Sequence, residues 1–153
     1  MRDMKKLFAS PKNLNRTVFV LSVIGVLIAI YVLQSFIRQT SILCVNTGCE
    51  QVRKNPASYL WGVPVPAVGL VGYSLLALLA FLKTLNPKAK TVHLYTKIML
   101  GIATFGVAFV SWFTYTELFV IRAVCTWCAV SAANMVVIFS LLIKSFSLNK
   151  ERA

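Results

Sequence analysis

Four long runs of apolar residues, separated by polar segments, dominate the sequence. They span roughly residues 17–36, 65–82, 98–121 and 124–143. Each run is close to the roughly 20 residues that a helix needs to cross the hydrocarbon core of a bilayer. We therefore predict an all-α membrane protein built as a bundle of four transmembrane helices. Because the runs take up most of the chain, we expect residues 1–153 to form a single integral membrane domain.

The composition agrees with this prediction. The chain is 58% hydrophobic and has only four acidic residues, which is too apolar for a soluble domain of its length. Residues 1–16 are polar and basic, as at the start of a secretory signal. The apolar run that follows is longer than the core of a signal peptide, and no small-residue cleavage site comes after it. We expect this run to be retained as the first membrane helix.

The formal net charge of +12 is unevenly distributed along the chain. Twelve of the sixteen basic residues lie before the first run, between the second and third, or after the fourth. Only Arg38, Arg53, Lys54 and Arg122 lie in the other two connections. The positive-inside rule then predicts that both termini are cytoplasmic. The basic excess is explained by topology and by attraction to anionic lipid, so we expect a membrane partner and no nucleic acid.

All four cysteines fall on the predicted extracytoplasmic side, where disulfides persist. Cys125 and Cys128 form a Cys-x-x-Cys pair at the start of the fourth run. At this spacing both side chains share one face of a helix, and a small adjustment allows a disulfide. The start of a helix also favours a thiolate, which indicates a redox pair. The alternative is that two small apolar residues simply pack in a membrane helix.

The connection of about 28 residues between the first two runs is unusually long for a segment without structure, which suggests a function. It contains Cys44 and Cys49, and Gly48 would let the chain turn back so that the two close a small disulfide ring. A structural staple is the alternative interpretation. Residues 49–54 could form a short amphipathic helix on the membrane surface, ended by Asn55-Pro56.

Three other kinds of residue, in or close to the apolar runs, attract attention. Glu117, near the outer end of the third run, is expected to reach the membrane interface, although it could instead handle protons at a redox site. Tyr73 is a polar side chain at depth, with packing as its expected role. Trp61, Trp112 and Trp127 all fall toward the extracytoplasmic side, as in an aromatic belt.

Several short motifs, taken together, resemble the vitamin K epoxide reductase family. In the long loop and second run these are Cys49-Glu-Gln-Val52, Asn55-Pro56, Gly62-Val-Pro64 and Gly69-Leu-Val-Gly72-Tyr73. In the fourth run they are Cys125-Thr-Trp-Cys128 and Ser131-Ala-Ala-Asn134. Cys44 stands where the family has its first loop cysteine, and the resemblance extends to about Phe139. The chain is most similar to bacterial members without a fused thioredoxin-like domain.

The resemblance implies a four-helix bundle around a quinone, with a long extracytoplasmic loop that carries a short interfacial helix. It implies that Cys125 and Cys128 pass electrons to a quinone of the ubiquinone or menaquinone type. Cys44 and Cys49 would relay these electrons from a thioredoxin-fold partner. Bacterial members make disulfides for secreted proteins. Since the sequence holds no such partner domain, we expect a separate, DsbA-like extracytoplasmic protein, with this chain in the cytoplasmic membrane.

The candidate catalytic residues are therefore Cys44, Cys49, Cys125 and Cys128. The candidate quinone contacts are Asn55, Tyr73, Trp127 and Cys128, and no metal is expected. Two features depart from the family pattern. Asn55 stands where the family commonly has Ser or Thr, although an amide also donates hydrogen bonds. The four residues between Cys44 and Cys49 are a tight spacing for the family.

Three alternatives remain. A DsbB-type oxidoreductase also has four helices, a quinone and four cysteines, but its Cys-x-x-Cys pair follows the first helix and its spaced pair lies in the second outer loop. The order here is the reverse. A non-enzymatic membrane protein with two structural disulfides would leave the position of Cys125 and Cys128 at a helix mouth unexplained. A four-cysteine zinc site is disfavoured by an oxidising exterior.

Overall fold

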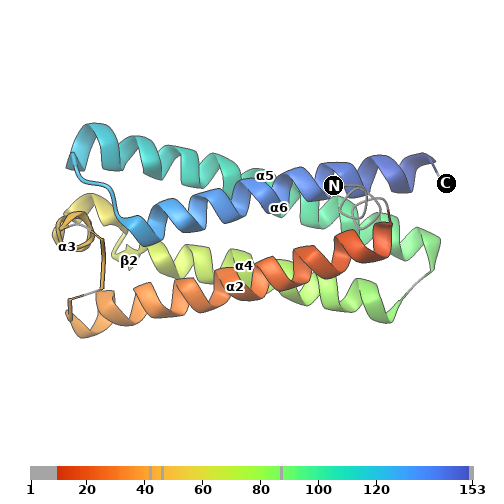
Figure 1. Ribbon diagram of the computed structural model, residues 1–153, viewed down its shortest axis with the longest axis horizontal. Coiled ribbons are helices and arrows are strands. Elements are labelled where there is room, and N and C mark those ends of the chain that lie inside the picture. The colour runs from red at the N-terminus through yellow and green to blue at the C-terminus, as the bar shows by residue number, and fades with distance from the viewer. Residues whose placement is uncertain (1–9, 42, 46, 87, 152–153) are drawn as a thin grey trace.

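Four long helices carry the four apolar runs. The computed structural model describes residues 10–41, 43–45, 47–86 and 88–151 (Figure 1). The long elements are α2 (Pro11–Arg38), α4 (Val65–Leu85), α5 (Ala89–Tyr115) and α6 (Thr126–Glu151), and α5 is continued by a π-helix, η2 (Thr116–Ile121). The predicted helices are confirmed, but most extend further into the basic flanking segments than the apolar runs. The fourth begins at Thr126, two residues later than predicted.

The helices pack as a closed ring. Helix α2 contacts α4 and α6, and α5 contacts the same two helices from the other side. Figure 1 shows all four running along the length of the molecule. The stretches Lys12–Arg38, Val65–Leu85, Lys90–Ile121 and Thr126–Asn149 are each long and apolar enough to cross a bilayer. The fold is therefore the predicted all-α, four-helix membrane bundle.

Apolar residues fill the bundle and also cover it. The interior cluster consists of Val18, Tyr73, Leu76, Ala80, Met99, Ala103, Met135, Ile138 and Leu142. On the outside, large apolar side chains such as Leu27 and Phe105 are more than half exposed. A surface of this kind is costly in water but suits contact with lipid chains, where backbone groups are already satisfied within the helices.

A small cap closes one end of the bundle. It consists of helix α3 (Gly48–Lys54), a 3₁₀ turn η1 (Pro56–Ser58) and a hairpin of β1 (Tyr59–Leu60) with β2 (Val63–Pro64). Figure 1 shows α3 and β2 at the end opposite the first turn of α2 and the last turn of α6. The short helix and its end at Asn55 confirm the prediction. The hairpin was not predicted. Trp61 and Gly62 form its turn, and both have positive φ, as a two-residue turn of type I′ requires.

A second apolar cluster joins the cap to the bundle. It contains Cys49 and Val52 from α3, Val65 and Phe113 from α4 and α5, and Ala123 and Cys125 just before α6. This cluster is distinct from the interior of the bundle. Because it takes residues from both halves of the chain, it brings the loop cysteines to the start of α6.

Candidate redox site

The two loop cysteines form a disulfide. Cys44 and Cys49 are bonded, with their Cα atoms 6.4 Å apart. This is the pairing that their spacing suggested. The two sulfurs differ in access, because Cys49 is only 2% exposed whereas Cys44 is half-buried. A thiol arriving from solution therefore meets Cys44 first.

Cys125 lies against this disulfide. Its thiol sulfur is 3.0 Å from the sulfur of Cys49, although the two residues are 76 positions apart in the sequence. Cys125 and Cys128 are both free thiols. Thiol–disulfide exchange proceeds by attack of a thiolate on one sulfur of a disulfide. The contact between Cys125 and Cys49 is thus the one that an exchange between the two pairs requires.

The first turn of α6 favours the thiolate of Cys125. Cys125 precedes the helix, and its carbonyl accepts the N–H of Ala129 at 3.0 Å, so it stands at the N-cap. A hydrogen bond from the Cys128 side chain lowers the pKa of the Cys125 thiol, and the backbone N–H groups of Cys128 and Trp127 lower it further, against the effect of burial. Cys125 is therefore the more readily ionised nucleophile at the mouth of the helix.

Gly48 allows α3 to approach the chain before α6. A Cβ atom at this position would overlap the carbonyl oxygen of Val124 and lie 3.0 Å from its carbonyl carbon. The sequence suggested that Gly48 serves to turn the chain back. That interpretation is wrong, because Gly48 is in the first turn of α3 and its φ is not positive. Because Gly48 has no side chain, α3 can lie close enough to the segment before α6 for Cys49 to reach Cys125.

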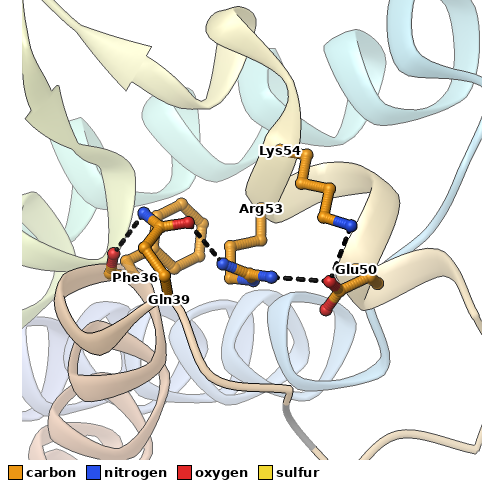
Figure 2. A network of polar contacts seen from close by, with 5 residues as sticks. All are labelled: Phe36, Gln39, Glu50, Arg53 and Lys54. Atoms are coloured by element: carbon orange, nitrogen blue, oxygen red, sulfur yellow. Dashed lines mark hydrogen bonds and ion pairs between the residues drawn. The ribbon is translucent and has the colours of Figure 1, made fainter.

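A buried arginine fixes α3 to the end of α2 (Figure 2). Arg53 is 3% exposed, and its guanidinium donates to Gln39 Oε1 and to Glu50 Oε1, each at 2.6 Å. Gln39 Nε2 in turn donates to the carbonyl of Phe36 at 2.9 Å. Lys54 also pairs with Glu50, and the hydrogen bonds from Arg53 and Lys54 lower the pKa of Glu50. The network therefore ties the helix that carries Cys49 to the first membrane helix.

Glu117 lies beneath the cysteines and is buried. It is 2% exposed, and its Oε1 accepts the backbone N–H of Cys125 at 3.4 Å. Its carboxyl group is also hydrogen-bonded to the Cys128 side chain. The expectation that Glu117 reaches the membrane interface is wrong. The π-helix η2 carries this residue, and its last turn closes when the N–H of Ala123 bonds to the carbonyl of Glu117.

A cavity of about 560 Å³ opens beside Cys128, between the four long helices. Its walls are almost entirely apolar, with residues from α2, α4, α5 and α6. The few polar groups include Tyr73, Trp127, Cys128 and Ser131. A planar ring with an apolar tail suits a cavity of this size and character, where a few polar groups fix its orientation.

Three of the four predicted quinone contacts line this cavity: Tyr73, Trp127 and Cys128. The hydroxyl of Tyr73 donates to the carbonyl of Ser131 at 2.7 Å, which ties α4 to α6 one turn below Cys128. Asn55 is elsewhere; its Oδ1 accepts the N–H of Ala57 at 2.9 Å and caps η1. Asn55 is not among the described residues that line the cavity, so its contact with a quinone stays a prediction.

Trp127 connects the cavity to the loop. Its indole N–H donates to the carbonyl of Leu43 at 2.8 Å, next to Cys44, and its ring meets Tyr31 of α2 edge-on. A single side chain between the two helix cysteines thus contacts both the cavity and the disulfide-bearing loop.

The sulfurs of Cys44, Cys49 and Cys125 lie within 4.8 Å of one another, a spacing that could hold a metal ion. Two of the three are joined in a disulfide, however, and metals bind the thiolate form. In this state the cluster is arranged for exchange of disulfides.

Sequence reasoning missed the roles of Gly48 and Arg53 here, and for Glu117 it gave a role at the redox site only as the alternative to the membrane interface. An acidic residue within an apolar run was the available signal for Glu117, since such groups are rare without a function. Gly48 directly precedes a loop cysteine, and a close approach was an alternative to a turn. For Arg53 the only signal in the sequence is that it is one of the few basic residues on the predicted extracytoplasmic side.

Comparison with protein-family models matches residues 16–143 to the vitamin K epoxide reductase family. The match covers α4 and α5 in full, α2 except for its start, α6 except for its end, and all four cysteines. Comparison with curated protein sequences finds no match.

Proposed function

The chain belongs to the vitamin K epoxide reductase family, and from this premise we propose that this membrane thiol–disulfide oxidoreductase makes disulfides for extracytoplasmic proteins by passing their electrons to a quinone. The electron donor is a separate thioredoxin-fold protein. The observation that carries the proposal is the 3.0 Å contact between the free thiol sulfur of Cys125 and the Cys49 sulfur of the loop disulfide.

The first exchange takes place at Cys44. A thiolate of the reduced partner attacks the Cys44 sulfur, the Cys44–Cys49 bond breaks, and Cys49 leaves as a thiolate. The second cysteine of the partner then displaces Cys44 and completes the partner's own disulfide. The greater exposure of Cys44 supports this assignment, because the sulfur of Cys49 is covered. The loop pair now carries two electrons.

The second exchange joins the loop to the helix. The Cys49 thiolate attacks Cys125 in an oxidised Cys125–Cys128 pair, and Cys128 leaves as a thiolate. Cys44 then attacks Cys49, which reforms the loop disulfide and releases Cys125. The outcome is the state of the structure, with the loop pair oxidised and the helix pair reduced. Each step is reversible, and its direction depends on reduction potentials, with about 30 mV giving a tenfold bias.

Cys128 faces the cavity that suits a quinone. A bound quinone supplies an acceptor for two electrons and two protons. Cys128 is the helix cysteine in the cavity wall, whereas Cys125 belongs to the cluster under the cap, so the two thiols of the pair have separate tasks. Tyr73 and Trp127 orient the ring, and the apolar walls exclude water. Asn55, as a donor to a quinone carbonyl, stays part of the proposal on the family pattern alone.

We further infer the orientation from the distribution of basic residues, with both termini cytoplasmic and the cap extracytoplasmic. The cap is then in the compartment where disulfides persist and where a thioredoxin-fold oxidant of secreted proteins would meet Cys44. The protein would be in the cytoplasmic membrane of a bacterium, as family members typically are.

The experiment that tests the function uses purified protein in lipid nanodiscs, a reduced thioredoxin-fold protein and a soluble quinone analogue. We expect the quinone absorbance to fall only when protein and reduced partner are both present. Cys44→Ser and Cys128→Ser should each abolish the reaction. Quinone reduction that survives either substitution would contradict the electron path, and no reduction by the unsubstituted protein would contradict the function.

A further inference from the structure

Glu117 is a buried acid for which the electron path has no use. It is 2% exposed, and it lies in a helical stretch that is long and apolar enough to cross a bilayer. No ion pair of Glu117 is found among the contacts of the described part of the chain. Burial of an unpaired carboxylate is costly, so such a group needs a compensating role. Its polar contacts are with the two helix cysteines.

The π-helix η2 is what brings this carboxyl group to the cysteines. A π-turn widens the helix by one residue, and such turns are frequent at functional sites. Here the turn ends with the N–H of Ala123 on the carbonyl of Glu117, and the side chain of the same residue accepts the N–H of Cys125. Glu117 is thus held by its backbone and by its side chain against the first turn of α6.

The chemistry at Cys128 requires a proton acceptor. A thiol becomes a nucleophile only after it loses its proton. The titratable groups in contact with Cys128, among the described residues, are Cys125 and Glu117. During exchange Cys125 is bonded to another sulfur and has no thiolate to receive a proton. The cavity on the other side of Cys128 is almost entirely apolar. Glu117 is then the remaining group in contact.

On this geometry, and resting on the proposed function, we infer that Glu117 is a catalytic residue that moves the proton of Cys128. When Cys128 attacks Cys125 in a mixed disulfide, the Glu117 carboxylate takes the thiol proton, the new Cys125–Cys128 bond forms, and the outgoing thiolate carries away the electron pair. In the opposite direction the protonated carboxyl group returns the proton to Cys128 as this sulfur leaves. In each direction one proton moves between the Cys128 sulfur and the Glu117 carboxyl group, so every step balances.

A purely structural role would also explain part of the geometry, because the carboxylate caps the start of α6. Glutamine separates the two roles. Glu117→Gln keeps the size of the side chain and an oxygen that accepts the N–H of Cys125, but it cannot take up a proton. A matched control is Thr116→Val, which removes the neighbouring buried hydroxyl. In the described part of the chain, that hydroxyl donates to the carbonyl of Trp112, one turn earlier, at 3.1 Å.

The test isolates the helix pair from both the loop and the quinone. Full-length protein with Cys44→Ser and Cys49→Ser is reduced, placed in nanodiscs and mixed with 2,2′-dipyridyl disulfide. Attack by Cys125 releases the first pyridine-2-thione, and closure by Cys128 releases the second, so the absorbance has two phases. We expect Glu117→Gln to slow the second phase by about 100-fold, at the low end of general acid–base effects, with little change in the first. Thr116→Val should change neither.

The second phase should also be slower in deuterated water in the protein that retains Glu117. This measurement does not depend on how well the glutamine variant folds. The inference is overturned if the second phase is equally fast with glutamine, if both phases slow together, or if deuterated solvent leaves closure unchanged. Because neither the loop cysteines nor a quinone takes part, failure of the relay leaves this result untouched. A working relay in Glu117→Gln would overturn the role of Glu117 alone.

Discussion

The contact between Gly48 and Val124 makes exchange between the two cysteine pairs sensitive to a single methyl group. In Gly48→Ala the new Cβ would overlap the carbonyl oxygen of Val124 and lie 3.0 Å from its carbonyl carbon. Non-bonded carbon atoms prefer about 3.5–4.0 Å, so α3 and the segment before α6 must separate by roughly 1 Å. The obstacle is backbone, which cannot rotate away as a flexible side chain could.

This displacement acts directly on the reacting sulfurs, because Cys49 is the next residue in α3. The distance between the sulfurs of Cys49 and Cys125 is 3.0 Å and would increase by a similar amount. A misplacement of about 1 Å can cost 10²-fold in rate. Overpacking of this kind costs about 1–3 kcal/mol in stability, which leaves most of a membrane bundle folded. We therefore expect Gly48→Ala to fold but to exchange about 100-fold more slowly.

The assay starts from a Cys128→Ser protein that has its Cys44–Cys49 disulfide intact and is held at acidic pH. A jump to neutral pH lets the Cys125 thiolate attack the Cys49 sulfur, so the Cys49–Cys125 bond forms and Cys44 leaves as a thiolate. Samples are quenched with acid and alkylated, and the cross-linked form is separated on a non-reducing gel. Gln51→Ala, an exposed position on α3, is the matched control and should react at the unsubstituted rate. An unchanged rate in Gly48→Ala would refute the idea that the glycine sets the approach of the two sulfurs.

Three further predictions concern the cap, the helix mouth and the orientation. Arg53→Gln removes hydrogen bonds to a charged group, so it should lower the free energy of unfolding by about 2 kcal/mol and slow the exchange between Cys49 and Cys125. The control Lys54→Gln changes an exposed side chain and should cost at most about 0.5 kcal/mol, with thermal unfolding as the measurement for both variants. Cys128→Ala removes the hydrogen bond that contributes most to the lowered pKa of Cys125, so this pKa should rise and the thiolate fraction at neutral pH should fall. The pH profile of Cys125 alkylation should then move to higher pH, and an unmoved profile would contradict the hydrogen bond. In a cysteine-free background, Lys88→Cys should resist a membrane-impermeant thiol reagent in intact cells and Trp61→Cys should react with it; the reverse pattern would invert the topology.

The sequence predicts the parts of this molecule that depend on local pattern. The length of the apolar runs predicts four membrane helices, and the structure has them. The spacing of Cys44 and Cys49 suggests their disulfide, since a ring of this size closes within one loop. The end of α3 at Asn55 follows from the proline after it. Each of these features needs only neighbouring residues.

The arrangement of the site depends on contacts that no local pattern contains. Cys49 and Cys125 meet across 76 positions of the sequence, and Gly48, which permits this, packs against the backbone carbonyl of Val124 at the same separation. Glu117 was expected at the interface because a regular helix would allow its side chain to extend to water. The π-turn directs it instead onto the cysteines, and the local pattern of apolar residues does not predict such a turn. The β1–β2 hairpin in the outer loop was likewise not predicted, although the short helix before it was.

The central claim is that electrons pass between the two cysteine pairs through Cys49 and Cys125. Two double variants test it most directly: Cys44→Ser with Cys128→Ser leaves only Cys49 and Cys125, and Cys49→Ser with Cys128→Ser leaves only Cys44 and Cys125. Mild oxidation followed by non-reducing digestion and mass spectrometry measures how fast each remaining pair is joined. The structure predicts rapid formation of the Cys49–Cys125 bond and much slower formation of the Cys44–Cys125 bond. Free thiols in both variants, or faster joining of Cys44, would contradict the relay.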